Sequence, residues 1–234
     1  MVSIGAATDI GLVRSVNQDC YGVSEKFAVV ADGMGGHNCG EIASKIAVDT
    51  ITDLLSKKKN IDFDVIGFAI KKANDEIFNK SKEDSSMSGM GTTVVLCAWD
   101  NDNAYIANVG DSRGYKICGS NITQITKDHS LVQKLLDNGD ISPEEASVRK
   151  DKNVLYRAVG CDEIPEPDFY ELSFQTGDVV LLCSDGLTNC VSNNEILKIV
   201  NENQDMQSAA DKLIQIANKN GGYDNITVLI IKFM

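Results

Sequence analysis

The chain of 234 residues is poor in several residue types, and each scarcity argues against a class of protein. It has only 3 Pro and 2 His, and its 7 Cys include no CxxC pair, which argues against a zinc site. Cys97 and Cys183 lie inside apolar runs, so we expect buried thiols in a reducing cytoplasm. No apolar run approaches the roughly 20 residues that span a bilayer. Residues 1–11 lack the basic start and apolar core of a signal peptide.

Positive charge is also scarce. The chain has 34 Asp and Glu residues against 22 Lys and Arg residues, which gives a formal net charge of −12. This balance argues against nonspecific binding to nucleic acid or to an anionic membrane surface. The sequence contains no segment with the composition of a linker and no internal repeat. We therefore expect one domain over residues 1–234.

The most informative stretch that is present runs from Phe27 to Gly36, with the sequence FAVVADGMGG. Residues 27–31 have the length and β-branched content of a strand that is buried on both faces. Asp32 stands where this strand leaves the core, and the glycines after it permit a close approach of the backbone. A carboxylate at the end of a buried strand is costly unless it is paired. With no Lys or Arg close by in the sequence, a divalent cation is the natural partner.

The same pattern of apolar run, Asp and Gly recurs along the chain. Asp185 follows the run VVLLCS, and Asp111 follows AYIANVG. Asp224 precedes the run ITVLII, while Asp19 and Asp128 lie in short polar loops. Taken singly, an aspartate in such a position is more often a turn residue or a helix cap than a metal ligand. Their recurrence at strand ends predicts a shared site for a hard cation, Mg²⁺ or Mn²⁺, because all the candidate ligands are oxygens.

The hydrophobic periodicity predicts strands in groups with helices between them. Strands are expected at residues 2–9, 27–31, 92–99, 104–109, 115–118, 122–125, 168–174, 178–183 and 225–233. Helices are expected at residues 40–56, 64–80, 131–139, 192–201 and 206–220. Residues 140–160 are expected to form a surface excursion. This order indicates the α+β class, with sheet packed on sheet and helices outside.

Seven motifs occur in order: RSVNQD, ADGMGGH, GTT, NVGDSR, DHS, CSDGL and GGYDNITV. Their order and spacing resemble those of the metal-dependent serine/threonine phosphatases of the protein phosphatase 2C (PPM) family, in particular its compact bacterial members. The resemblance runs from Arg14 to Val228. It implies a single catalytic domain built on a central antiparallel β-sandwich flanked by helix pairs (α-β-β-α layers). It also implies a metal centre at one end of the sandwich and a flap segment at about residues 137–160.

The resemblance also implies a set of metal ligands for two Mn²⁺ or Mg²⁺ ions. By motif match these ligands are Asp19, Asp32, Gly33 (through its carbonyl), Asp128, Asp185 and Asp224. Asp32 would bridge the two ions. Asp128 together with Asp185 would match a third, weaker metal site. No organic cofactor is expected.

Arg14 matches the arginine that binds the substrate phosphate, and its planar fork of donors suits phosphate oxygens. The leaving alkoxide needs a proton, for which His37 is the best side-chain donor and a water on the metal ions is the alternative. His129 competes for this role, but it precedes a predicted helix and can equally be a loop or cap residue. Arg113 and Asp111 are expected to form a structural ion pair that supports the site.

Two positions depart from the family pattern. Gln18 stands where a glutamate is often found, and Arg149-Lys150 stands in the flap where many relatives have His-Pro. These departures bear on the water around the second ion and on substrate preference. Asn225 is expected to orient Asp224 as an outer partner.

The resemblance implies hydrolysis of phosphoserine and phosphothreonine on proteins by a metal-bridged hydroxide, in a cytoplasmic monomer that opposes a serine/threonine kinase. A nucleotide-binding kinase is a poor fit, because DGMGG is followed by no GK[ST] and lacks the GxGxxG spacing. Two further functions stay open. One is that of a phosphatase-fold protein that binds phosphoproteins without turnover, and the second is that of a phosphomonoesterase for small molecules.

Overall fold

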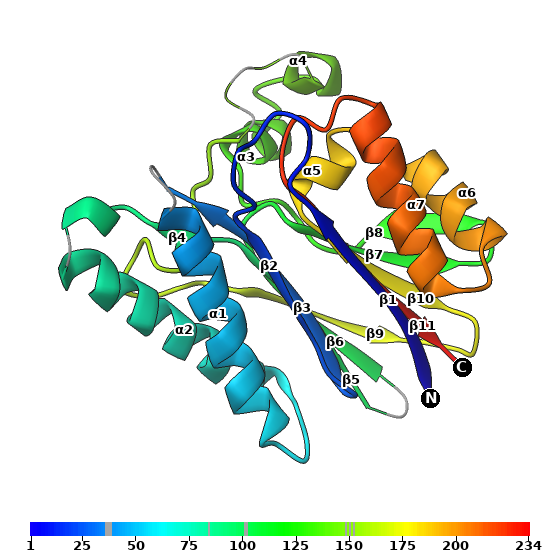
Figure 1. Ribbon diagram of the computed structural model, residues 1–234, viewed down its shortest axis with the longest axis horizontal. Coiled ribbons are helices and arrows are strands. Elements are labelled where there is room, and N and C mark those ends of the chain that lie inside the picture. Colours follow the sequence, from blue (N-terminus) through cyan, green and yellow to red (C-terminus); the bar gives the residue numbers. More distant parts are fainter. Residues whose placement is uncertain (36–38, 84, 101–102, 148, 150, 152) are drawn as a thin grey trace.

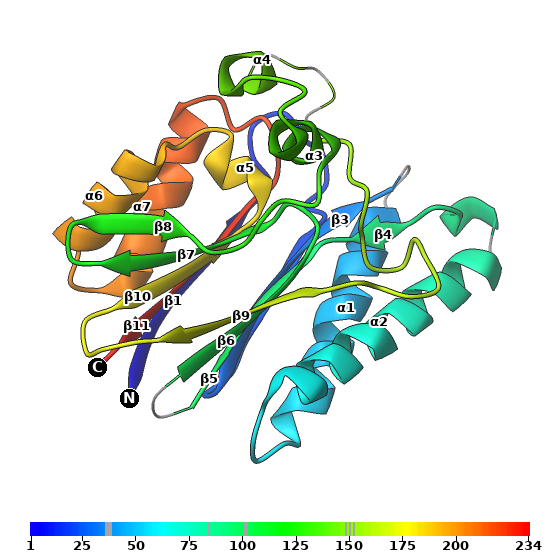
Figure 2. The ribbon, with the colours of Figure 1, turned by 180° about the vertical axis from the view of Figure 1, so that it is seen from behind.

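The computed structural model describes residues 1–35, 39–83, 85–100, 103–147, 149, 151 and 153–234. Two antiparallel sheets pack face to face (Figures 1 and 2). The first sheet has, in spatial order, β1 (Val2–Asp9), β11 (Ile226–Phe233), β10 (Val179–Cys183), β7 (Arg113–Cys118) and β8 (Asn121–Gln124). The second has β2 (Asp19–Val23), β3 (Phe27–Met34), β5 (Val94–Trp99), β6 (Asn103–Val109) and β9 (Asp168–Ser173), and β4 (Gly91–Thr92) pairs with β3. The earliest and latest strands are therefore neighbours.

Helices cover both outer faces of the sandwich (Figure 1). The pair α1 (Cys39–Ser56) and α2 (Phe63–Glu83) packs on the second sheet, and the pair α6 (Asn193–Glu202) and α7 (Met206–Lys219) packs on the first. Shorter helices are η1 (Ser85–Met87), α3 (Leu131–Asn138), α4 (Pro143–Ser147) and α5 (Asp185–Thr188). The α+β class with α-β-β-α layers is thereby confirmed. Among the described residues, no helix combines the length and the apolar character that crossing a bilayer requires.

Strand β3 shows why its sequence is an uninterrupted apolar run. Phe27 and Val29 pack against the helices of the outer layer, whereas Ala28 and Val30 pack between the two sheets. Successive side chains of a strand point to opposite faces, so a strand covered on both sides must be apolar at every position. Where this double cover ends, the sequence changes to Asp32 and the carboxylate can reach the end of the sandwich.

The sequence does not predict four of the observed elements: β2, η1, α4 and α5. Helix α5 has only four residues, too few for a periodic pattern. Helix α4 lies inside the predicted surface excursion, yet its capping box is visible in the sequence. Ser142 Oγ accepts from the Glu145 N–H at 3.2 Å, and Glu145 Oε2 accepts from the Ser142 N–H at 2.7 Å. Pro143 then occupies the first helical position, which suits proline.

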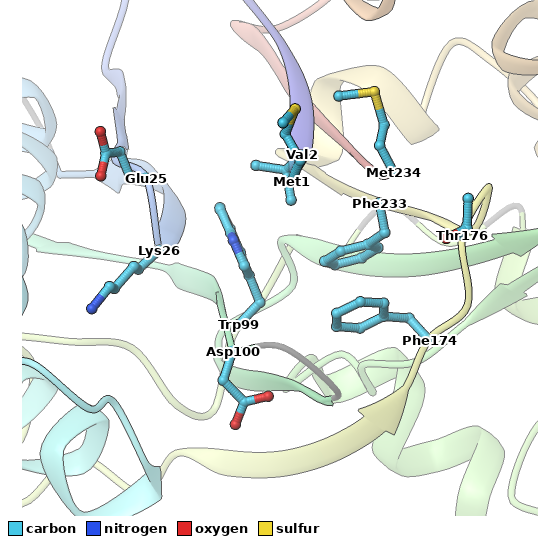
Figure 3. Close-up of a pocket in the computed structure, with 10 residues that line it drawn as sticks. All are labelled: Met1, Val2, Glu25, Lys26, Trp99, Asp100, Phe174, Thr176, Phe233 and Met234. Atoms are coloured by element: carbon cyan, nitrogen blue, oxygen red, sulfur yellow. The ribbon is translucent and has the colours of Figure 1, made fainter.

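The end of the sandwich that holds both chain ends is filled by aromatic side chains (Figure 3). Phe174 stacks on Phe233 with 3.6 Å between ring centroids, and Trp99 meets Phe233 edge-on at 6.3 Å. A cavity of about 410 Å³ beside these rings is lined by Glu25 and Lys26 among others. The predicted site residues do not line this cavity. They lie at the opposite end.

Candidate active site

The predicted aspartates lie together where strands from both sheets end. Asp32 lies near the end of β3, Asp111 between β6 and β7, Asp185 two residues after β10, and Asp224 two residues before β11. With Arg14 they line one pocket of about 220 Å³. The sequence predicted that aspartates at the strand ends would lie close together, and the structure shows this for these four residues.

Asp32 is held through its backbone by a threonine that follows β4. The Thr93 N–H donates to the Asp32 carbonyl at 2.8 Å, and Thr93 Oγ1 accepts from the Asp32 N–H at 3.0 Å. The Thr93 hydroxyl also shares a hydrogen bond of 2.6 Å with Ser112 Oγ. These contacts interrupt the predicted strand 92–99 between β4 and β5. They fix the backbone that carries Asp32, and sequence analysis did not assign this role to Thr93.

Asp19 faces Asp32 across the β2–β3 pairing. Ser184 Oγ donates to Asp19 Oδ2 at 2.7 Å, while Oδ1 is buried and receives no hydrogen bond from the described residues. Desolvation, opposed by the Ser184 hydrogen bond and reinforced by the Asp185 charge, raises the pKa of Asp19 to about 7. Desolvation followed by repulsion from Asp19 and Asp185 raises the pKa of Asp32 well above its ordinary value. Neither carboxyl group forms an ion pair with another described residue, although Arg14 is close enough for the Asp32 charge to help raise its pKa.

Arg113 pairs with Asp128, so the predicted ion pair between Arg113 and Asp111 is wrong. Its Nε and Nη2 atoms donate to the two Asp128 carboxylate oxygens at 3.0 and 2.7 Å. The reason is the strand geometry. Arg113 is the first residue of β7, and the N–H of the next residue, Gly114, donates to Thr126 Oγ1 at 2.9 Å. This hydrogen bond holds the segment after β8, which includes Asp128, beside Arg113. Desolvation and the charge of Asp185 raise the pKa of Asp111 to about 8. Asp111 is thus part of the acidic site.

Asp128 lies beside the main pocket. It lines a neighbouring cavity of about 290 Å³ together with Asp111 and Asp185. Both of its carboxylate oxygens accept hydrogen bonds from Arg113, and Gln124 Nε2 donates to Oδ1 at 3.1 Å. Asp128 and Asp185 thus line the same cavity, as the predicted third metal site would require. Asp128 as a metal ligand stays a prediction.

Arg14 lies in the pocket and is paired with a predicted metal ligand. Its Nη2 donates to Asp224 Oδ2 at 2.7 Å, and its side chain is half exposed. The hydrogen bond to Asp224 is the main reason that the pKa of Arg14 is raised. The other oxygen of Asp224 accepts from the Asn225 N–H at 2.9 Å. Arg14 can therefore reach both the acidic cluster and a ligand that arrives from solvent.

Asn225 has a larger role than the sequence predicts. Its backbone N–H holds Asp224, but its side chain binds the loop of residues 10–18. The Nδ2 atom donates to two carbonyl groups of this loop, both at 3.0 Å, and Oδ1 accepts from the Gln18 N–H at 2.8 Å. Asn225 therefore fixes the loop that carries Arg14.

Gly33 lies where β3 meets the start of α1 and lines the pocket. A Cβ atom at this position would come within 2.1 Å of the Gly40 carbonyl oxygen, so only glycine allows this approach. The Gly33 N–H donates to the Gln18 carbonyl at 3.1 Å, and Ser44 Oγ donates to the same carbonyl at 2.6 Å. The backbone of Gln18 thus links β3 to α1, while the residue also lines the pocket.

The two histidines were candidates for proton donation. His37 lies outside the described residues. His129 is 1% exposed, its Nδ1 accepts from the Gly110 N–H at 3.1 Å, and its Nε2 lies 3.2 Å from Asp168 Oδ2. Because Nδ1 accepts, Nε2 carries the proton and donates it to Asp168. Burial lowers the pKa of His129. His129 is a structural residue that does not line the acidic pocket.

The predicted flap, about residues 137–160, borders the pocket. Asn153 and Leu155 line it, and Leu155 is bridged to Ser130. Arg149 is paired with Asp151 at 2.6 Å, and Lys150 lies outside the described residues. The limits of the flap and a single catalytic domain stay predictions.

The donor set fits a divalent cation by its chemistry. It consists of oxygens only, it includes a buried carboxylate oxygen without a hydrogen bond at Asp19, and its mutual repulsion raises carboxyl pKa values. Among the described residues, no three Asp, Glu, His or Cys side chains already surround a common ion position. Several oxygens are instead turned to protein partners, as Asp224 is to Arg14.

The raised pKa values predict how metal and pH affect stability. When a chelator keeps the protein free of metal, Asp19 has a pKa of about 7 and Asp111 a pKa of about 8 in the folded state. In the unfolded state the pKa of an aspartate is about 3.9, so both residues bind their protons more tightly when the protein is folded. The free energy of unfolding should therefore fall as pH rises from about 4 to about 8. Mn²⁺ should raise the unfolding temperature more at about pH 8 than at about pH 5.5, because it neutralises these carboxylates. Thermal unfolding at both pH values tests this, and an equal shift at the two would contradict it.

Comparisons with known proteins agree with this site. The family model described as protein phosphatase 2C matches residues 13–227. The serine/threonine phosphatase stp of Listeria monocytogenes serotype 4b (strain F2365) is 41% identical over 237 residues, which cover 96% of this chain and 93% of that protein. The crystal structure of the Mycobacterium tuberculosis serine/threonine phosphatase PstP/Ppp superposes with a TM-score of 0.93 at 34% identity, covering 99% of this chain and 98% of the other.

A second solved structure bears on the metal site. The catalytic domain of serine threonine protein phosphatase PstP, in complex with 2 manganese ions, has a TM-score of 0.91 and 34% identity, with 99% of this chain and 97% of that chain covered. Family model, sequence and fold all point to one group of proteins. The chain belongs to the protein phosphatase 2C family and is a serine/threonine protein phosphatase of the bacterial type.

Proposed function

We propose that this chain hydrolyses phosphoserine and phosphothreonine in proteins with two Mn²⁺ or Mg²⁺ ions held in the acidic pocket. The observation that carries the proposal is the convergence of Asp32, Asp185 and Asp224 with Arg14 in one pocket that spans both sheets. The two manganese ions of the PstP catalytic domain support the choice of metal. The oxygen-only donor set supports it independently.

The proposed ligands divide between the ions. Asp32 would bridge the two ions, Asp185 and Asp224 would complete one site, and the Gly33 carbonyl with Asp19 would serve the other. Asp128, beside Asp185, would contribute to a third ion. When bound, such ions supply a water nucleophile that ionises near neutral pH and neutralise charge on the phosphate.

Arg14 would bind the phosphate of the substrate. Its guanidinium now donates to Asp224, at the edge of the pocket, and its side chain is half exposed. If Asp224 held a metal ion instead of Arg14, the donors of Arg14 would be available for two phosphate oxygens. Arg14 would thereby orient the phosphate for in-line attack, and no covalent nucleophile on the protein is needed.

The leaving serine or threonine oxygen has to receive a proton. His129 is bonded to Gly110 and Asp168, away from the pocket. His37 stays the proposed side-chain donor.

The proposed substrates are proteins phosphorylated by a serine/threonine kinase in the cytoplasm, and the proposed active form is a monomer. All seven cysteines are free, which supports a reducing compartment.

Phosphate release from a phosphothreonine peptide, with and without Mn²⁺, tests the proposed function. We expect release that requires the metal and stops when a chelator removes it. Stoichiometric peptide binding by folded protein without release would instead support a phosphoprotein-binding function. Much faster turnover of small phosphate esters than of any peptide would support a small-molecule phosphomonoesterase.

A further inference from the structure

Three exposed apolar side chains belong to the two loops that carry Arg14 and Asp224. Leu12 is 69% exposed, Val13 is 65% exposed and Tyr223 is 65% exposed. We call these three residues the rim patch. Leu12 and Val13 directly precede Arg14, and Tyr223 directly precedes Asp224. The patch is therefore continuous in sequence with the residues proposed to bind phosphate and metal.

Two contacts hold the two loops of the rim patch together. The Leu12 N–H donates to the Gly222 carbonyl at 2.7 Å, and Arg14 Nη2 donates to Asp224 Oδ2 at 2.7 Å. In Figure 1 the dark-blue loop after β1 and the red loop before β11 lie side by side at the end of the sandwich away from the chain ends. The patch is thus a surface made by two loops that are fixed to each other.

The two loops meet closely. A Cβ atom on Gly11 would lie 2.2 Å from the Asp224 carbonyl oxygen, and one on Gly222 would lie 2.9 Å from Leu12 Cγ. Both glycines also have positive φ values, +79° and +50°. The Leu12 side chain therefore lies along Gly222 of the other loop while most of its surface stays exposed.

Single apolar residues scattered over a protein surface are normal and need no explanation. Three exposed apolar side chains on two loops that contact each other are instead typical of an interaction site. An extended peptide advances about 3.5 Å per residue. With its phosphate at Arg14, the residues one or two positions away lie within about 7 Å of that point. This distance reaches residues that adjoin Arg14 and Asp224 in the chain. A flanking side chain of the substrate can therefore meet the patch.

We propose that the rim patch binds an apolar side chain next to the phosphorylated residue of the substrate protein. The enzyme then favours phosphorylation sites with an apolar neighbour over sites with polar neighbours. This inference rests on the proposed function, because the position of the patch matters only if Arg14 receives the phosphate. The occupant is a segment of a phosphorylated protein.

The test compares phosphothreonine peptides that differ only in their flanking residues. One set carries Leu at a single position, either one or two residues before or after the phosphothreonine, and the reference peptide carries Ser at all four. The wild-type enzyme should dephosphorylate at least one Leu peptide about five- to tenfold more efficiently in kcat/KM, as expected for partial burial of one apolar side chain. Leu12→Ser and Tyr223→Ser should each reduce this ratio toward one.

Phe68→Ser is the matched control. Phe68 lies on α2 and is 51% exposed, so its replacement removes a similar apolar surface away from the patch. Its Leu-to-Ser peptide ratio should equal that of the wild type.

Each remaining outcome overturns the inference in a recognisable way. A wild-type ratio of one at all four positions, with metal-dependent release from every peptide, refutes the patch and leaves the proposed function intact. An equal loss on Leu and Ser peptides in the patch variants means that the patch only supports the Arg14 loop. Concentration-dependent association that the variants abolish means that the patch joins two copies of this chain. No release from any peptide refutes the proposed function itself.

Discussion

Asp185→Asn should reduce metal-dependent phosphate release from a phosphothreonine peptide by on the order of a thousandfold, because several kcal/mol of stabilisation by the ions is lost. The substitution keeps the size of the side chain and the hydrogen bond from Asn189 Nδ2, which is 3.0 Å from Asp185 Oδ2. The fold should survive, and in a chelator the variant should melt no earlier than the wild type. The reason is that the Asp185 charge raises the pKa of Asp19, Asp32 and Asp111, so its removal relieves repulsion.

Asp178→Asn is the matched control. Asp178 directly precedes β10 and Asp185 lies two residues after it, but the Asp178 carboxylate pairs with Lys116 at 3.1 Å and lies outside the pocket. This variant should keep activity near that of the wild type. Activity in Asp185→Asn at the level of Asp178→Asn would remove the metal centre from the proposed mechanism. Calorimetric titration with Mn²⁺ adds an independent readout, since only Asp185→Asn should lose affinity.

Arg14→Ala should lower kcat/KM for a phosphothreonine peptide by about 10- to 100-fold, chiefly through KM. Hydrogen bonds to charged groups are worth about 1.5–3 kcal/mol, which corresponds to this range. The same variant should bind Mn²⁺ more tightly when no substrate is present. Arg14 is the hydrogen-bond partner of Asp224, and its loss frees an oxygen ligand and removes a positive charge from the pocket.

Arg14→Lys separates charge from geometry. Lysine keeps the positive charge but cannot offer two parallel donors to a phosphate, so its KM should lie between those of the wild type and Arg14→Ala. Steady-state kinetics and Mn²⁺ titration on the three proteins give both readouts. An unchanged KM together with an unchanged Mn²⁺ affinity in Arg14→Ala would contradict the assignment.

The sequence predicted the positions of the pocket aspartates because apolar runs determine where strands end. Strand β3 is apolar over residues 27–31 because it is covered on both faces, and Asp32 follows where this cover stops. The same argument placed Asp185 after β10 and Asp224 before β11. A pattern local to each strand was enough to predict this end of the sandwich as the site.

Contacts between residues far apart in the chain could not be predicted in this way. The Asn225 side chain binds the Gln18 N–H across 207 positions, and nothing near Asn225 in the sequence identifies that partner. Arg113 was assigned to Asp111 because the two are close in sequence. It pairs with Asp128, 15 positions later, because β7 and β8 form a hairpin that carries Asp128 back to it. Which residue forms an ion pair or hydrogen bond with which other residue therefore depends on how the strands assemble into sheets.

The pairing of β1 with β11 has a consequence for synthesis of the protein on the ribosome. Arg14 is translated early, yet its partner Asp224 comes 210 positions later, and β11 lies between β1 and β10 in the sheet. Until β11 leaves the exit tunnel, the Arg14 loop lacks its Asn225 anchor and β1 has no neighbouring strand. We therefore expect a nascent chain in which this segment has not yet emerged to lack a complete pocket and phosphatase activity.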